Sequence, residues 1–196
     1  MILLGLTGSI GTGKSTTSAL FAARGVPVHD ADATVHALYR GPAVPLIAAE
    51  FPGTVIDGIV DRTRLGAAVL GDALALQRLE AVIHPLVRQA ELSFRARIAA
   101  SAHRLAVIDV PLLFETGGDL RVDATVVVTC DAVTQRARVL SRPGMTVEKF
   151  ENIKAKQMPD ADKRRRAHFL VDSGHGFDSA GRQVDAILRA CAGMLR

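Results

Sequence analysis

The residues with the clearest chemical meaning lie near the N-terminus, in the segment GSIGTGKS from Gly8 to Ser15. The segment matches the pattern GxxxxGK[ST] in full, and it lies between a short apolar run and an amphipathic stretch, as a strand, loop and helix would. Glycines let consecutive backbone N–H groups turn inward, so the loop can hold an anion at a helix N-terminus. The pattern predicts a site for the phosphates of a nucleotide.

Two side chains of this loop have defined tasks in phosphate chemistry. Lys14 can reach the β- and γ-phosphates, and the Ser15 hydroxyl can ligate Mg²⁺. The glycine order, GxxGxG followed by lysine, counts against the alternative of a dinucleotide-binding loop. A guanine-specific protein would need an NKxD stretch, and Asn152-Ile153-Lys154-Ala155 lacks the aspartate. The sequence therefore favours ATP over GTP.

Carboxylates at predicted strand ends are the next candidates, because a kinase needs a group that orients the acceptor hydroxyl. Asp30 and Asp32 follow one predicted strand, at the sheet edge where ligands of such folds bind. Either could face the acceptor, although Asp32 could instead cap the next helix. Asp109 ends another apolar run; it could hold the metal through water, or it could be a partly buried structural carboxylate.

The elements that must position these residues follow from the apolar pattern. Predicted strands are Ile2–Leu6, Val26–His29, Leu105–Val110, Val126–Thr129 and Phe169–Val171. Predicted helices are Lys14–Arg24, Ala132–Ser141, Val147–Met158 and Ser179–Leu195, with a helical insert from Asp61 to Ala102 that is interrupted at Gly71 and Pro85. Strands that are apolar throughout and alternate with helices predict a three-layer α/β fold with a parallel sheet. We expect one domain of 196 residues.

Composition narrows the class of partner. A net charge of +4 suits an anionic ligand and lacks the dense charge blocks of a dedicated nucleic-acid binder. Two cysteines cannot build a disulfide framework, and no apolar run approaches the roughly 20 residues that span a bilayer. We therefore expect a cytoplasmic protein that binds neither nucleic acid nor membrane, as a monomer or a small homo-oligomer.

Several motifs, in order along the chain, resemble those of the dephospho-CoA kinases as far as about Gly174. The matching segments are GLTGSIGTGKST at Gly5–Thr16, the triplet Asp30-Ala31-Asp32, Asp57-Gly58, Asp61-Arg62 with Leu65, Leu79-Glu80, His84-Pro85, Pro111–Glu115, Gln135 with Arg138 and Arg142, and Gln157. The phosphate loop alone indicates only a nucleotide, whereas the DAD, HP and PLLFE segments together are specific.

The resemblance implies transfer of the γ-phosphoryl group of ATP to the ribose 3′-hydroxyl of dephospho-CoA. It also implies a P-loop kinase core with strand order 2-3-1-4-5, a helical acceptor-binding insert at 56–104 and a lid at 141–166. Lys14, Asp32 and Arg142 would be catalytic, and Ser15 and Asp109 would hold Mg²⁺. The implied ATP contacts are Gly8, Gly11, Thr12, Gly13, Lys14, Ser15, Thr16 and Gly174, and the implied dephospho-CoA contacts are Asp32, His84, Pro85, Leu112 and Glu115.

Some of these segments have structural alternatives. Pro85 could occupy the first position of a helix, and Leu112-Leu113-Phe114 could be a buried corner. The basic run Lys163–Arg166 could bind phosphates or nucleic acid, but a solvated helix face is favoured. Two other functions stay open: a P-loop kinase for another small molecule such as a nucleoside or its monophosphate, and a nucleotide-dependent regulatory ATPase.

Overall fold

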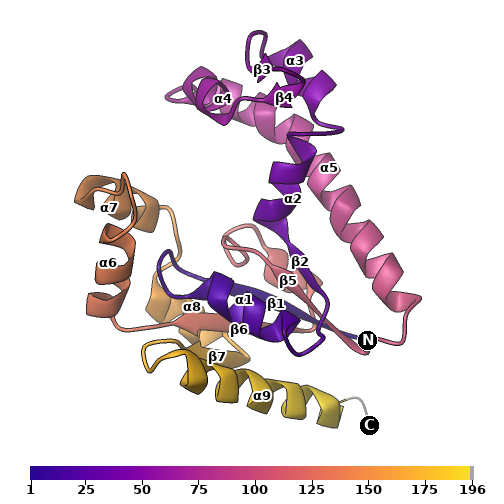
Figure 1. The fold of residues 1–196 in the computed structure, drawn as a ribbon, viewed down its shortest axis with the longest axis vertical. Coiled ribbons are helices and arrows are strands. Elements are labelled where there is room, and N and C mark those ends of the chain that lie inside the picture. The colour runs from indigo at the N-terminus through magenta and orange to yellow at the C-terminus, as the bar shows by residue number, and fades with distance from the viewer. Residues whose placement is uncertain (195–196) are drawn as a thin grey trace. The chain divides into compact units, whose positions relative to one another are not determined.

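A computed structural model describes residues 1–194, which form two compact units (Figure 1). The first unit, here the sheet unit, contains residues 1–29 and the chain from Ser101 onward. The second, the helical unit, contains Asp30–Ala100. Among the described residues, no helix has the length and apolar character needed to cross a membrane.

The sheet unit is built on five strands: β1 (Ile2–Gly8), β2 (Val28–Asp30), β5 (Leu105–Asp109), β6 (Ala124–Thr129) and β7 (Phe169–Asp172). They lie in the order β2-β5-β1-β6-β7, which is the predicted order 2-3-1-4-5 when only these five are numbered. The pairs of β1 with β5, β1 with β6 and β6 with β7 are parallel. Every residue of β1 and β6 is buried, as expected of central parallel strands, and the predicted α/β class is confirmed.

Two helices enclose the apolar core of this unit. Helix α1 (Lys14–Ala22) contacts β1, and α9 (Phe177–Met194) contacts both α1 and β7. The buried residues of α9 include Ala180, Val184, Ile187 and Cys191, whose spacing places them on one helix face. Helix α9 begins two residues before the predicted Ser179–Leu195, and Leu195 lies outside the described residues.

Shorter helices complete the sheet unit. Helix α6 (Ala132–Leu140) is capped by Asp131, whose carboxylate accepts from Thr134 N at 2.8 Å. The predicted helix Val147–Met158 ends earlier, as α7 (Val147–Ala155), and a separate α8 (Asp160–Arg166) carries the basic run. A 3-10 turn, η1 (Gly118–Arg121), precedes β6.

The helical unit has its own small core of Leu38, Ala43, Ile47, Phe51, Val60, Leu65, Ala75 and Ile83. Its elements are α2 (Ala31–Leu38), α3 (Val44–Glu50), the hairpin of β3 (Val55–Ile56) and β4 (Ile59–Val60), α4 (Arg62–Val69) and α5 (Ala73–Ala99). Asp57 and Gly58 form the hairpin turn with φ of 50° and 73°, the pairing of positive φ angles that favours Asp-Gly.

The predicted interruption at Pro85 is wrong, because α5 continues through it. Proline cannot donate to the carbonyl four residues earlier and clashes with it, which disfavours a helix interior. The helix buries residues on both sides of the proline, including Ala75, Ile83 and Phe94. Packing of a long apolar stripe therefore outweighs the local preference.

Candidate functional site

The phosphate loop joins β1 to α1 through two glycines in the left-handed region. Gly11 has φ +80° and Gly13 has φ +90°. A Cβ at position 11 would come within 2.4 Å of Val139 Cγ2, and one at position 13 within 3.0 Å of Ser173 Oγ. Both conformation and space therefore require glycine, because the loop lies directly against α6 and the end of β7.

Helix α1 begins at Lys14 directly after this loop. Within residues 1–194, no side chain caps its N-terminus by a hydrogen bond to the first turn. The N–H groups of a first helical turn have no intrahelical acceptor, and the helix dipole gives this end a partial positive charge. A phosphate group is therefore a fitting partner for the start of α1.

A hollow of about 360 Å³ lies beside the loop, within the sheet unit. It is lined by Gly11, Gly13, Thr16, Thr17, Arg138, Arg142, Ser173, Gly176, Phe177 and Ala180. Four of the predicted site residues, Gly11, Gly13, Thr16 and Arg142, meet there. The two arginines give the hollow cationic groups next to an anion-binding loop.

Lys14 forms an ion pair with Asp109 at the end of β5. The Lys14 Nζ to Asp109 Oδ1 distance is 2.5 Å, and the side chains are 14% and 1% exposed. The structure thus brings together the predicted phosphate-binding lysine and the predicted metal-site carboxylate. Asp109 holds the ammonium group at the mouth of the loop, because β5 lies next to β1 in the sheet.

Two glutamine side chains hold the loop backbone at Ile10. Gln157, in the connection between α7 and α8, accepts from Ile10 N at 2.9 Å. Gln135 on α6 donates to Ile10 O at 2.8 Å. The backbone N–H and C=O of Ile10 are therefore both fixed by side chains distant in sequence. The motif pattern alone did not indicate that the two glutamines have this role.

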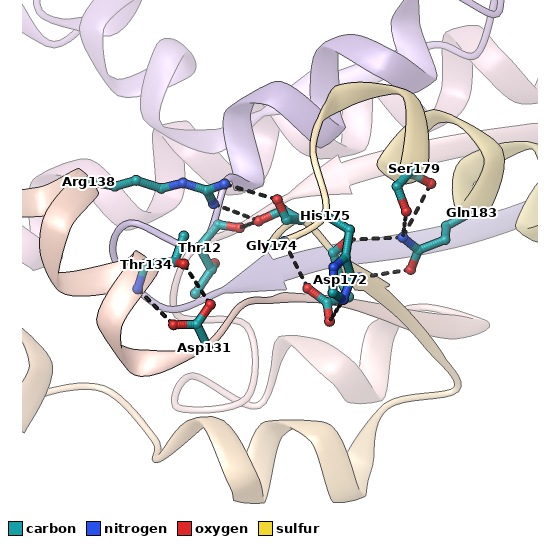
Figure 2. A network of polar contacts seen from close by, with 10 residues as sticks. Thr12, Asp131, Thr134, Arg138, Asp172, Gly174, His175, Ser179 and Gln183 are labelled. Atoms are coloured by element: carbon teal, nitrogen blue, oxygen red, sulfur yellow. Dashed lines mark hydrogen bonds and ion pairs between the residues drawn. The ribbon is translucent and has the colours of Figure 1, made fainter.

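Ser173, directly after β7, joins the loop to α6 and was not among the predicted site residues. Its hydroxyl donates to Thr12 O at 2.7 Å and accepts from Arg138 Nη1 at 2.8 Å. Figure 2 shows this network, with Arg138 extending from α6 toward the loop. A serine at a strand end carries no motif, so only its position at the ligand-binding edge of the sheet could have pointed to it. Its neighbour Gly174, a predicted ATP contact, is exposed and donates through its N–H to Asp172 Oδ1 at 2.8 Å.

The Pro111–Glu115 segment follows β5 and is only partly a buried corner. Leu113 and Phe114 are buried, whereas Leu112 is 38% exposed. Glu115 is bound to other protein groups: its Oε1 lies 2.9 Å from Lys163 Nζ and accepts from Met158 N at 2.7 Å.

These contacts set the pKa of Glu115. Partial burial alone would raise the pKa, but the hydrogen bonds from Lys163 and Met158, with the Lys163 charge, bring the net pKa of Glu115 below its usual value. The Lys163 side chain is 0% exposed, and Arg166 binds Asp119 at 2.7 Å and stacks over Phe114. The expectation of a solvated basic face is therefore wrong for Lys163, whereas Arg166 makes its contacts while its side chain stays exposed.

Three comparisons with known proteins identify the family and the fold of the chain. The model of the dephospho-CoA kinase family matches residues 2–178. The chain belongs to the dephospho-CoA kinase family. A dephospho-CoA kinase of Mesorhizobium japonicum is 62% identical over 188 residues, which cover 96% of this chain and 95% of the relative.

Solved structures show the same fold. The Thermus thermophilus protein TT1252 aligns with a TM-score of 0.84 at 34% identity over 96% of this chain and 97% of its own. A dephospho-CoA kinase from Campylobacter jejuni aligns with a TM-score of 0.65 at 18% identity, over 96% of each chain. The recognition of a dephospho-CoA kinase from its ordered motifs is confirmed.

The remaining residues predicted from the resemblance to dephospho-CoA kinases lie in the helical unit. Asp32 lies in the first turn of α2, and His84 and Pro85 lie within α5; all three are exposed. The cap of α2 is Asp30, which accepts from Ala33 N at 2.9 Å. The structural alternatives are therefore wrong for Asp32 as a cap and for Pro85 as a first helical residue.

Proposed function

We propose that this chain transfers the γ-phosphoryl group of ATP to the ribose 3′-hydroxyl of dephospho-CoA, which yields coenzyme A and ADP. Family membership supports the reaction and the acceptor. Within the structure, one observation carries the assignment: α1 begins without a capping side chain after a loop whose glycines are sterically required, with Lys14 held beside it by Asp109.

The phosphate side acts through charge and position. Phosphoryl transfer depends mainly on donors placed around the transferring group, so few covalent steps fall to the protein. The loop N–H groups and Lys14 bind the phosphates, with Gly8, Thr12 and Thr16 shaping the loop around them. Arg142 follows the C-terminus of α6 and precedes Pro143-Gly144, and Gly144 has φ +72°. That turn suits a lid over residues 141–166 that brings Arg142 to the transferring group.

The residues also fit a magnesium ion. Ser15 offers an exposed hydroxyl in the first turn of α1, and Asp109 offers a carboxylate. Residues 1–194 contain no group of three or more His, Cys, Asp or Glu side chains that could hold a metal. Mg²⁺ keeps waters and takes phosphate oxygens with one or two protein ligands, which Ser15 and Asp109 could supply. When bound, the ion neutralises charge that develops on the phosphates.

The acceptor side uses side chains that stay available to a ligand. We assign Asp32 to orient the 3′-hydroxyl and to accept its proton, a task that a positioned carboxylate can perform. His84, Pro85 and the exposed Leu112 are each assigned as a contact of dephospho-CoA. Glu115 contributes by fixing the loop on which Leu112 lies, because its carboxylate is bound to Lys163 and Met158.

The decisive experiment supplies purified protein with ATP, Mg²⁺ and an acceptor, and detects products by mass. Dephospho-CoA, adenosine and AMP are offered together and separately. We expect coenzyme A from dephospho-CoA and little product from the other two. Product formed only from adenosine or AMP would support a kinase activity but rule out dephospho-CoA as the acceptor. Consumption of ATP without a phosphorylated product would favour a regulatory ATPase.

The regulatory alternative relied on the basic run as a docking surface. Three of its four cations form ion pairs: Lys163 with Glu115, Arg165 with Asp162 and Arg166 with Asp119. This reduces the free charge that a nucleic acid could bind. We propose a cytoplasmic enzyme, a monomer or small homo-oligomer, whose partners are small molecules.

A further inference from the structure

Ser173 uses all of its polar groups to connect three segments of the sheet unit. Its N–H donates to Thr129 O at 2.9 Å, its hydroxyl donates to Thr12 O at 2.7 Å, and both its oxygens accept from Arg138. The residue is 8% exposed. A hydroxyl can donate and accept at once, and this one does both between a loop carbonyl and a guanidinium group.

The bond to Thr12 O fixes a peptide plane of the phosphate loop. A trans peptide holds its C=O and the following N–H in one plane and pointing in opposite directions. Because the Thr12 carbonyl is turned toward Ser173, the N–H of Gly13 is turned away from it. If the Thr12–Gly13 peptide could rotate freely, the Gly13 N–H would no longer be held in the direction in which the loop binds an anion.

The same serine fixes Arg138. Nη1 and Nη2 bind the hydroxyl and the carbonyl oxygen of Ser173 at 2.8 and 2.9 Å. Two bonds from the planar fork to one residue fix the orientation of the guanidinium group, because the fork is rigid. Arg138, Gly13 and Ser173 line the same hollow. Figure 2 shows the Arg138 side chain pointing toward the segment that contains Thr12.

We propose that Ser173 is a positioning residue for ATP: through its hydroxyl it orients the Gly13 N–H and the Arg138 guanidinium group for the same polyphosphate. The inference rests on the proposed function of the loop. According to this proposal, Ser173 controls the affinity for ATP although it lies outside the GxxxxGK[ST] motif. Other residues bind the acceptor.

The test compares Ser173→Ala, Arg138→Gln and the double variant. Affinity for a non-hydrolysable ATP analogue is measured by calorimetry, and KM for each substrate by coenzyme A formation. Hydrogen bonds to charged groups are worth enough that we expect Ser173→Ala to weaken analogue binding about tenfold. The KM for dephospho-CoA should change less than about twofold, and the double variant should bind about as weakly as the weaker single variant.

Two further variants separate positioning from folding. Thr134→Ala removes a hydroxyl on the same helix that donates to Asp131 Oδ2 at 2.6 Å and leaves the Arg138 guanidinium group in place, so analogue affinity should be unchanged. Ser173→Cys nearly keeps the volume but offers only a weak S–H donor. It should weaken binding as alanine does, and it serves if Ser173→Ala fails to fold.

Each outcome decides the inference. Unchanged analogue affinity in both Ser173 variants would overturn it, as would effects of Ser173→Ala and Arg138→Gln that simply multiply in the double variant. A lowered melting temperature with wild-type affinity would mark Ser173 as merely structural. If the wild-type protein binds the analogue but leaves dephospho-CoA unphosphorylated, the proposed reaction fails while the affinity comparison still decides the part played by Ser173.

Discussion

The two units of the molecule hold their functional residues in different ways. In the sheet unit, the phosphate loop is fixed by neighbours: Ile10 by two glutamines, Thr12 by Ser173 and Lys14 by Asp109. In the helical unit, Asp32, His84 and Pro85 are exposed side chains on helices. The difference supports the proposal that phosphate binding is preorganised by the fold, whereas the proposed acceptor residues have side chains exposed to a ligand.

The largest expected effect tests the preorganised side. Lys14→Ala should lower kcat/KM by about a thousandfold or more, because it removes the positive charge that stabilises the negative charge on the transferring phosphoryl group. Coenzyme A formation measures it, with the melting temperature as a check of the fold. Turnover within tenfold of the wild type would show that the loop does not act on ATP as proposed.

On the acceptor side, Asp32→Asn should lower kcat by about a hundredfold or more, since a positioned proton acceptor is worth about that factor. Analogue affinity should change little. Asp30→Asn is the matched control, because asparagine caps a helix about as well as aspartate. Equal losses in the two variants would show that the Asp32 carboxylate has no special part in the reaction.

The pair of Glu115 and Lys163 gives a stability effect within the sheet unit. Glu115→Gln leaves a buried ammonium group without its carboxylate, which should cost about 3 kcal/mol or more of the free energy of unfolding. Denaturant unfolding measures this loss. Glu151→Gln breaks an exposed pair with Arg136 and should cost less than about 1 kcal/mol; similar losses would refute the difference between buried and exposed pairs.

The pH dependence of that pair has a defined sign. Because the fold lowers the pKa of Glu115, its contribution is complete above the unfolded pKa of about 4.3 and is lost as the pH falls through the folded value. The stability gap between wild type and Glu115→Gln should therefore narrow below about pH 4. A gap that widened on acidification would contradict the assignment.

The smallest effect concerns Pro85. Proline inside a helix costs up to about 3 kcal/mol relative to alanine, so Pro85→Ala should raise the melting temperature. If the exposed proline contributes to the acceptor surface, the same change should raise the KM for dephospho-CoA severalfold. A more stable variant with unchanged kinetics would remove Pro85 from the site.

Local patterns explain how much was predictable. Continuous apolar runs predicted the five strands, and the glycines and Lys14 predicted the loop, because these signals act over a few neighbouring residues. The order of the strands came only from the resemblance to dephospho-CoA kinases. The partners of Ile10 and Thr12 lie more than 120 residues away, so no local pattern contained them. The prediction of a solvated Lys163 fails for the same reason. Its neighbours in sequence are three arginines, which indicate a solvated helix face, and only the fold brings Lys163 to Glu115.

The two hydrogen bonds that fix the Ile10 backbone leave its side chain free to be replaced. Gln135 and Gln157 bind only its backbone, so the side chain at this position can change while the loop keeps its shape, provided that the residue retains an N–H. The chain contains no tryptophan. Ile10→Trp would therefore place a single tryptophan at the phosphate loop, giving a fluorescence signal for nucleotide binding.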